Sequence, residues 1–265
     1  MFRRPATHVG RTGVDRSGRS VTDTLIAGPR LAVLLVALVL VAAVVAWFGR
    51  SGLARPVVLA SARATGQLAV VSLVIVAVLD SVWWSGAFVL LMTAVATLTS
   101  ARRVGAIRTA WQVAVPIMAG AGPVFALLLL SGAVAARPVV LIPIAGILIG
   151  GAMTATSLAG VRAIDELRTR HGEYEAALAL GFGDRAAALE LCRRPAALAL
   201  VPALDQTRTV GLVTLPGAFV GVLLGGGSPV QAGLTQLLVL IALLAVEAVA
   251  VVLTAELVAV GRIAG

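Results

Sequence analysis

Long apolar segments, separated by short polar connections, make up most of this sequence. Most of them approach the ~20 residues that a helix rising about 1.5 Å per residue needs to cross a bilayer core. Seven can be delimited, at approximately 31–48, 57–79, 82–99, 111–131, 138–160, 196–224 and 233–260. The pattern therefore predicts an all-α fold, a membrane bundle of about seven transmembrane helices.

The sixth segment differs from the others because it is too long for one simple span and contains polar and helix-breaking residues. Asp205 and Arg208 lie three residues apart in it, and Pro216 and Gly217 interrupt it further on. Proline removes a backbone donor and glycine lowers the cost of bending. We therefore expect a broken or tilted helix, and broken helices at membrane depth usually line a cavity.

The distribution of arginines predicts the orientation of the bundle. The connections 49–56, 100–110 and 161–195 hold two, three and six arginines, whereas those on the opposite side hold at most one each. Arginine-rich connections lie in the cytoplasm, so the C-terminus is predicted to be cytoplasmic in a multi-pass protein of the plasma membrane. Seven crossings then place the N-terminus outside, against the rule, because residues 1–30 are also rich in arginine.

Residues 1–30 show neither helical nor strand periodicity, so they are predicted to form a disordered tail. The transmembrane domain is predicted to cover residues 31–265. It includes the polar connection 161–195, which is dense in charges of both signs.

Composition agrees with a lipid environment. Apolar residues make up 60% of the 265 residues and charged residues 12%, with a mean hydropathy of +1.04, whereas soluble domains have about 25% charged residues. The net charge of +9 comes with no lysine and no basic stripe carrying interleaved aromatics, so no nucleic-acid partner is expected. A P-loop requires lysine, so this chain cannot be its own ATPase.

Enzymatic chemistry finds no support in the sequence. Two histidines and one cysteine, Cys192, form no ligand cluster or nucleophile motif. We therefore expect no catalytic residues, no resident metal site and no cofactor.

The connection 161–195 is predicted to contain two short helices. The stretch 173–180 has high helix propensity, and Gly181 can end it in a left-handed conformation. Asp184 is predicted to cap a second helix that continues to about Pro195. The connection is either a solvated linker or a helical turn that seats in a groove of a soluble partner.

Ionisable residues inside the apolar segments are candidates for function, since each costs on the order of 2.5–3.5 kcal/mol to insert. Asp205 and Arg208 can form a pair that fixes helix orientation, or they can line or gate a translocation path. Glu247 lies deep in the last segment. The break at Pro216 and Gly217 can line the translocation path or allow close helix packing, and the sequence favours neither interpretation.

Several motifs together resemble one family of transporters. Glu175-Ala176-Ala177 followed by Gly181 resembles the EAA loop with which ABC permeases dock on their ATPase. The other motifs are Arg63–Leu68, Leu141–Gly146 with Gly150 and Met153, Pro202–Asp205 with Arg208–Gly217, and Gly221 with Pro229–Ala232 and Gln236. They resemble the bacterial iron-export ABC permeases, a family that includes plant aluminium-tolerance membrane proteins.

Three positions depart from that family's pattern. Gly151 stands where an asparagine is expected, Gly-Ala-Phe follows Pro216 where Gly-Met-Met is usual, and Glu247 stands where a small or apolar residue is expected.

The resemblance implies a permease subunit that works with a separate cytoplasmic ABC ATPase, as a homodimer of permease chains. It implies export of iron or of another metal or small solute. The residues expected to dock on the ATPase are Glu173, Glu175, Ala176, Ala177 and Gly181. Those expected to line or gate the path are Asp205, Arg208, Pro216, Gly217 and Glu247. A secondary transporter driven by an ion gradient remains the alternative.

Overall fold

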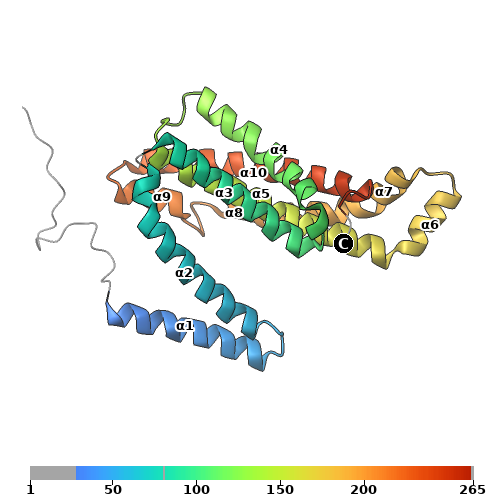
Figure 1. Ribbon diagram of the computed structural model, residues 1–265, viewed down its shortest axis with the longest axis horizontal. Coiled ribbons are helices and arrows are strands. Elements are labelled where there is room, and N and C mark those ends of the chain that lie inside the picture. The colour runs from blue at the N-terminus through green and yellow to red at the C-terminus, as the bar shows by residue number, and fades with distance from the viewer. Residues whose placement is uncertain (1–27, 80, 264–265) are drawn as a thin grey trace, which may run out of the picture. The chain divides into compact units, whose positions relative to one another are not determined.

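Helices follow the apolar segments of the sequence closely. The computed structural model describes residues 28–79 and 81–263 (Figure 1). The chain divides into two units, residues 1–75 and 76–265. Residues 1–27 of the predicted disordered tail lie outside the described part of the chain. Pro29 and Arg30, which were assigned to that tail, belong to the first helix instead.

The first unit contains α1 (Pro29–Phe48) and most of α2 (Ala54–Leu79). The turn between them is closed by Gly49, whose N–H donates to the Val45 carbonyl at 2.9 Å, and by the Ser51 hydroxyl, which donates to the Ala46 carbonyl at 3.0 Å. No residue of α1 is buried. A helix that is apolar on every face suits lipid.

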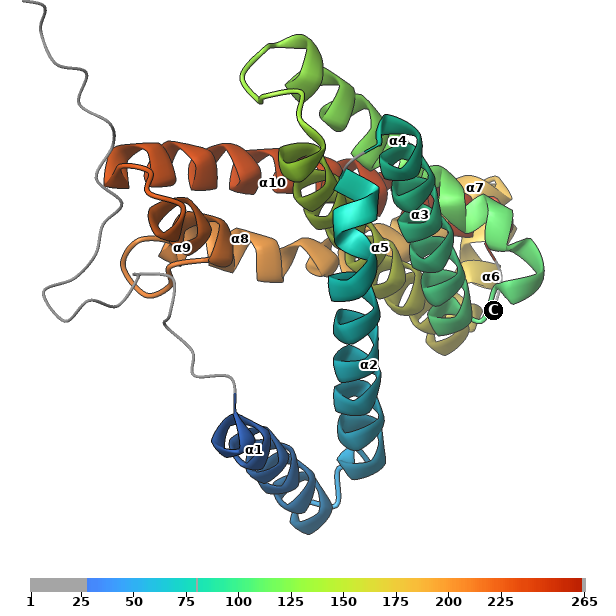
Figure 2. The ribbon, with the colours of Figure 1, turned by 60° about the vertical axis from the view of Figure 1, so that its left-hand side comes forward.

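The second unit is built around two long helices, α5 (Pro138–Thr169) and α10 (Pro229–Ala259). They pack against each other, and α4 (Ala110–Leu130) packs against both (Figure 2). α3 (Val82–Val104) packs against α5 and α4. The shorter elements are η1 (Ile107–Thr109), α6 (His171–Ala179), α7 (Asp184–Ala197), η2 (Leu198–Leu200), α8 (Val201–Thr209) and α9 (Gly217–Leu224).

Small residues allow these helices to approach closely. A Cβ atom at Gly120 of α4 would lie 2.7 Å from the backbone carbonyl oxygen of Val246 on α10. Between α3 and α5, the hydroxyls of Ser100 and Ser157 lie 2.8 Å apart, and both donate to the Met153 carbonyl. Close backbone approach and interhelical hydrogen bonds are the usual means of helix association in lipid.

The all-α membrane fold is confirmed, with one difference in detail. Within the described residues, six helices are long and apolar enough to cross a membrane. The predicted sixth segment, 196–224, is instead divided among the end of α7, η2, α8 and α9, with the chain non-helical from Val210 to Pro216. The expected break is therefore present, and it separates two helices of nine and eight residues.

Connection 161–195 is more helical than predicted. Its first residues continue α5 as far as Thr169, and the two short helices are α6 and α7. Gly181 has the expected left-handed backbone, with φ of +93°. The prediction that Asp184 caps the second helix is wrong, because Gly183 holds the N-cap position and no side chain caps it. Pro195 does not end α7, which continues to Ala197.

Candidate functional site

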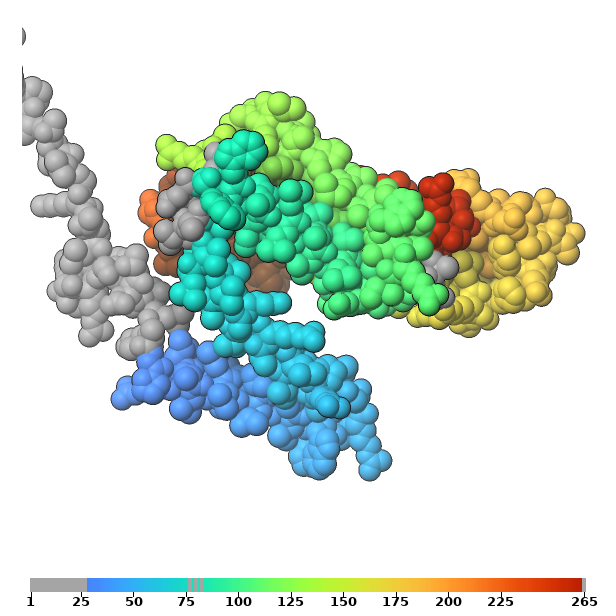
Figure 3. Space-filling model, in the orientation of Figure 1, coloured from blue at the N-terminus to red at the C-terminus, as the bar shows by residue number. Residues whose placement is uncertain are grey.

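The polar connection and its helices form one end of the second unit. α6 and α7 protrude beyond the ends of α3 and α4, visible as the yellow and orange surface in Figure 3. We call residues 171–197, which span α6, the turn and α7, the docking segment. The docking segment contains all five residues that the sequence analysis assigned to ATPase docking.

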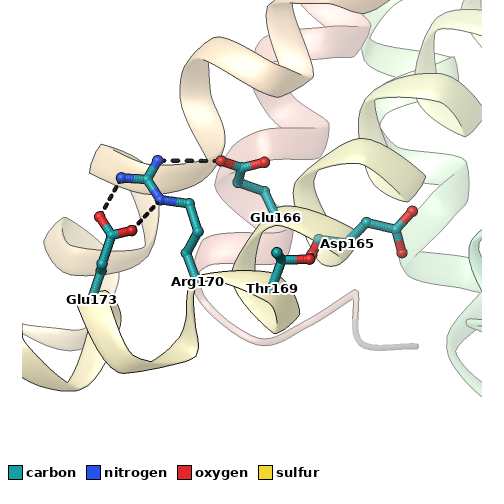
Figure 4. A network of polar contacts seen from close by, with 5 residues as sticks. All are labelled: Asp165, Glu166, Thr169, Arg170 and Glu173. Atoms are coloured by element: carbon teal, nitrogen blue, oxygen red, sulfur yellow. Dashed lines mark hydrogen bonds and ion pairs between the residues drawn. The ribbon is translucent and has the colours of Figure 1, made fainter.

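Arg170 joins α5 to α6. Its Nη1 donates to Glu166 Oε1 at 3.2 Å, its Nε donates to Glu173 Oε1 at 2.7 Å, and its Nη2 pairs with the second Glu173 oxygen (Figure 4). The hydrogen bond from Arg170 lowers the pKa of Glu173, and the same bonds raise the pKa of Arg170. This network links the end of α5 to the first turn of α6.

A groove of about 750 Å³ lies between the end of α5, α6 and α7. Glu173, Ala176 and Ala177 line it, together with Leu180 and the charged residues of α5 and α7. Glu175 does not line it and instead pairs with His171, whose Nε2 lies 3.3 Å from Glu175 Oε1. The expected docking residues therefore fall on two sides of α6.

Two large apolar side chains stand out at the turn after α6. Leu180 is 80% exposed and Phe182 is 51% exposed, on either side of Gly181. The sequence analysis did not select them as site residues. The available signal was the presence of two large apolar residues flanking a glycine in a charged connection.

α7 is anchored by small and apolar side chains. Ala187, Ala188, Leu191, Cys192 and Ala196 are buried. Burial raises the pKa of the Cys192 thiol, which agrees with a reduced, unreactive cysteine. Across the turn, the Tyr174 hydroxyl donates to Asp184 Oδ1 at 3.3 Å. Desolvation, followed by the Asp184 charge, raises the pKa of Tyr174.

A bidentate ion pair connects α7 to the last helix. Arg185 Nε donates to Glu256 Oε2 at 2.9 Å, and its Nη2 donates to Oε1 at 2.8 Å. Sequence reasoning missed this pair, because the two residues are 71 positions apart.

The residues expected at the membrane pathway form two separate groups. Asp205 and Arg208 on α8 are exposed and pair at 3.7 Å. Pro216 and Gly217 begin α9. Glu247 forms the second group by itself. It lies on α10, 11 residues after Gln236, and this spacing corresponds to about 16 Å along a helix.

The broken segment relies on a side chain from α10. No side chain of its own caps α9. Gln236, which is buried, accepts a hydrogen bond from the Phe219 N–H at 3.2 Å through Oε1. A cavity of about 270 Å³, lined almost entirely by apolar side chains, lies between this segment and α10. The same N–H also donates to the Pro216 carbonyl at 3.0 Å, so Gln236 supplies a second acceptor, from a neighbouring helix, at the first turn of α9.

Glu247 is 8% exposed and sits against α5. A Cβ atom at Gly151 would lie 2.9 Å from Glu247 Oε1. Two of the departures from the family pattern, Gly151 and Glu247, are therefore neighbours in space. Glu247 forms no hydrogen bond or ion pair with any of the residues that the structure describes.

The fold and these features define a polytopic membrane protein with one interrupted helical segment and a protruding polar end. Residues 30–261 match the model of the uncharacterised protein family UPF0014. The chain belongs to this family, and the resemblance inferred from its motifs is confirmed.

Several relatives were found among known proteins. The chain is 34% identical over 224 residues to UPF0014 membrane protein STAR2 of Oryza sativa subsp. japonica, covering 83% of this chain and 79% of that protein. It is 32% identical over 205 residues to protein ALUMINUM SENSITIVE 3 of Arabidopsis thaliana, covering 76% and 75%. It is 35% identical over 147 residues to the "Probable iron export permease protein FetB" of Escherichia coli K12, covering 54% and 55%. No solved structure matches the chain.

Proposed function

We propose that this chain is the membrane-spanning permease of an ABC transporter and that the docking segment binds a separate cytoplasmic ATPase. The observation that carries this proposal is the protruding α6 with its exposed tip, Leu180 and Phe182, beside acidic residues. A short helix seated in a groove of a partner is a recurring recognition mode. Large apolar anchors with a charged rim are typical of such interfaces.

The ATPase must be another chain, because this one contains no lysine with which to build a P-loop. ATP-driven transporters of this class pair two permeases with two ATPases, so we propose a homodimer of this chain in the plasma membrane, with its C-terminus in the cytoplasm. We propose iron, another metal or a small solute as cargo moving outward, and the name of the Escherichia coli relative supports iron.

In this proposal the broken segment and Glu247 belong to the moving part. ATP binding draws the ATPases together, α6 moves with them, and the bundle changes the side to which it opens. Asp205, Arg208, Pro216 and Gly217 would gate the path near the break, and Glu247 would line it deeper in the bundle. The non-helical stretch and the adjoining cavity support this assignment, since irregular backbone at membrane depth usually lines a cavity.

A transporter driven by an ion gradient is the second candidate, and one observation favours it. Glu247 is a buried acid without a partner among the described residues, and such residues often mark ion or proton pathways. This candidate requires no ATPase, so the presence of that partner discriminates between the two.

The first test is co-purification. The chain is expressed with each ABC ATPase of its source, extracted in mild detergent and isolated by a tag on the permease. The wild type is expected to retain one ATPase, and the double variant Leu180→Ser/Phe182→Ser is expected to lose it. Each hot-spot anchor is worth about 2 kcal/mol or more, so affinity should fall at least about 30-fold per anchor.

Asp165→Arg is the matched control, because Asp165 is exposed on the neighbouring α5 and points away from the Arg170 network (Figure 4). It should bind the ATPase like the wild type. Failure of the wild type to bind any ABC ATPase would leave the gradient-driven transporter as the better candidate.

Gly181 offers a second test of docking. Its φ of +93° places the turn in a conformation that only glycine and asparagine adopt easily. Gly181→Val should distort the tip and weaken ATPase binding, whereas Gly181→Asn should retain it. Gly172→Ala, at an α6 position with no atom within 4 Å and an ordinary helical φ, is the control. Equal binding by all three variants would contradict the docking role of the tip.

A further inference from the structure

The pair between Arg185 and Glu256 is unlike the other ion pairs of the described residues. Those others, Arg170–Glu166, Arg170–Glu173, His171–Glu175 and Arg208–Asp205, each join residues three or four positions apart. Arg185–Glu256 alone joins two parts of the chain that are distant in sequence. Like Arg170–Glu173, it is bidentate, with hydrogen bonds of 2.9 and 2.8 Å, a geometry that fixes direction as well as distance.

The stability of the fold does not explain this pair. The side chains of Arg185 and Glu256 are 60% and 32% exposed, and exposed ion pairs contribute little to stability. α7 already packs on α5 and α10 through small buried residues such as Ala188 and Ala255. The packing of these small residues sets how closely the helices approach, and the forked ion pair adds a polar contact of defined direction between the start of α7 and the end of α10.

Its position lies between the docking tip and the membrane bundle. Arg185 is the second residue of α7, directly after the turn at Gly181–Gly183, and Glu256 lies in the last turn of α10. Figure 1 shows the end of α10 beside α7.

The order of the chain shows why such a pair is needed. α5 runs into α6 through Arg170, so movement of α6 reaches α5 by covalent continuity. α10 follows much later in sequence and meets the docking segment only through non-covalent contacts. It is also the helix that contains Gln236 at the break and Glu247 deeper in the bundle.

We propose that Arg185 and Glu256 are positioning residues that transmit movement of the docked α6 to α10. This inference rests on the proposed docking of an ATPase at the tip. Neither residue touches the ATPase or the cargo in this proposal. They act by keeping the first turn of α7 and the last turn of α10 in one register.

Charge reversal provides the test. Arg185→Glu, Glu256→Arg and the double variant are prepared in complex with the ATPase in proteoliposomes. A spectroscopic label at Val252→Cys, an exposed position of α10, reports movement on addition of ATP. All variants should bind the ATPase, because the tip is unchanged. In each single variant the ATP-induced signal should be about fivefold or more smaller than in the wild type, as expected for a typical coupling free energy. The double variant should recover it.

Arg168→Glu is the matched control. Arg168 is an exposed arginine just before the docking segment that forms no ion pair with other described residues. Its reversal should leave the signal unchanged. Full signal in both single variants, or a loss that the double variant does not recover while it remains folded, would overturn the proposal.

A second measurement needs no ATPase. Hydrogen exchange of the permease alone should show the amides of residues 187–190, the first hydrogen-bonded amides of α7, losing protection in each single variant and regaining it in the double variant. Unchanged exchange in the single variants would count against the pair as a positioning device. If the wild type binds no ATPase, the docking proposal fails, while the exchange experiment still decides whether the pair fixes α7 to α10.

Discussion

Two glycines of α4, two positions apart, have very different surroundings. A Cβ atom at Gly120 would lie 2.7 Å from the backbone oxygen of Val246, whereas one at Gly122 would have no atom within 4 Å. Backbone cannot move aside as a flexible side chain can. Gly120 therefore sets the closest approach of α4 to α10, and Gly122 has no such role.

This difference predicts opposite results from one substitution. Gly120→Ala should destabilise the protein by about 1–3 kcal/mol, the usual cost of overpacking. Gly122→Ala should be neutral or stabilising by up to about 1 kcal/mol, because alanine is the better helix former. Thermal unfolding in detergent measures both. A melting temperature of Gly120→Ala equal to that of Gly122→Ala would contradict the observed packing of α4 on α10.

At the scale of elements, the interrupted segment depends on its neighbour. α8 and α9 are too short to be stable alone, and the chain from Val210 to Pro216 forms no helix. The turn uses Gly211, with φ of +82°, whose N–H donates to the Thr214 carbonyl at 2.9 Å. The first turn of α9 then takes its polar partner from Gln236 on α10. The break is held by tertiary contacts with α10.

Replacing that partner should loosen the start of α9. Gln236→Leu keeps a similar volume but removes one of the two acceptors of the Phe219 N–H, which retains the Pro216 carbonyl at 3.0 Å, at a cost of about 0.5–1.5 kcal/mol. Gln236→Glu keeps an acceptor oxygen and should be milder. Hydrogen exchange of residues 217–220 measures the effect directly. Identical exchange in the leucine and glutamate variants would show that the hydrogen bond does not hold α9.

At the scale of the whole molecule, the path of the chain fixes which ends share a side. α7 contacts the end of α10, and Arg185 pairs with Glu256 there, so the docking segment and the end of α10 lie at one end of the second unit. Pro229, where α10 begins, lies at the other end of this 31-residue helix. α8 and α9 together must therefore cross from one end to the other.

Cysteine labelling can test this path in cells. Cys192 is first replaced by alanine, and single cysteines are introduced at Val230, at the start of α10, and at Gly172, in α6. An impermeant thiol reagent added outside should label Val230→Cys and not Gly172→Cys. If neither cysteine is labelled until the membrane is permeabilised, both lie on the cytoplasmic side. That result would mean that α8 and α9 return to the side of the membrane from which they enter. Removal of the Arg-rich tail should leave this pattern unchanged, if the remaining connections determine the orientation.

Sequence patterns predicted the class of the protein, the limits of most helices, the break at Pro216 and the two short helices of the docking segment. These are local properties, since hydrophobic length, helix propensity and the backbone preferences of proline and glycine act over a few residues. The motifs also determined the family, which the match over residues 30–261 confirms.

Contacts between residues that are distant in sequence were visible only in the tertiary structure. It placed Glu256 on Arg185, Gln236 on the amide of Phe219, and Glu247 against Gly151. It also separated Glu175 from the groove that Glu173 lines. Nothing in the spacing of these residues along the chain predicts such contacts, because they depend on how rigid helices rotate and approach when they pack. That arrangement is set by small residues such as Gly120 and the alanines of α5 and α10.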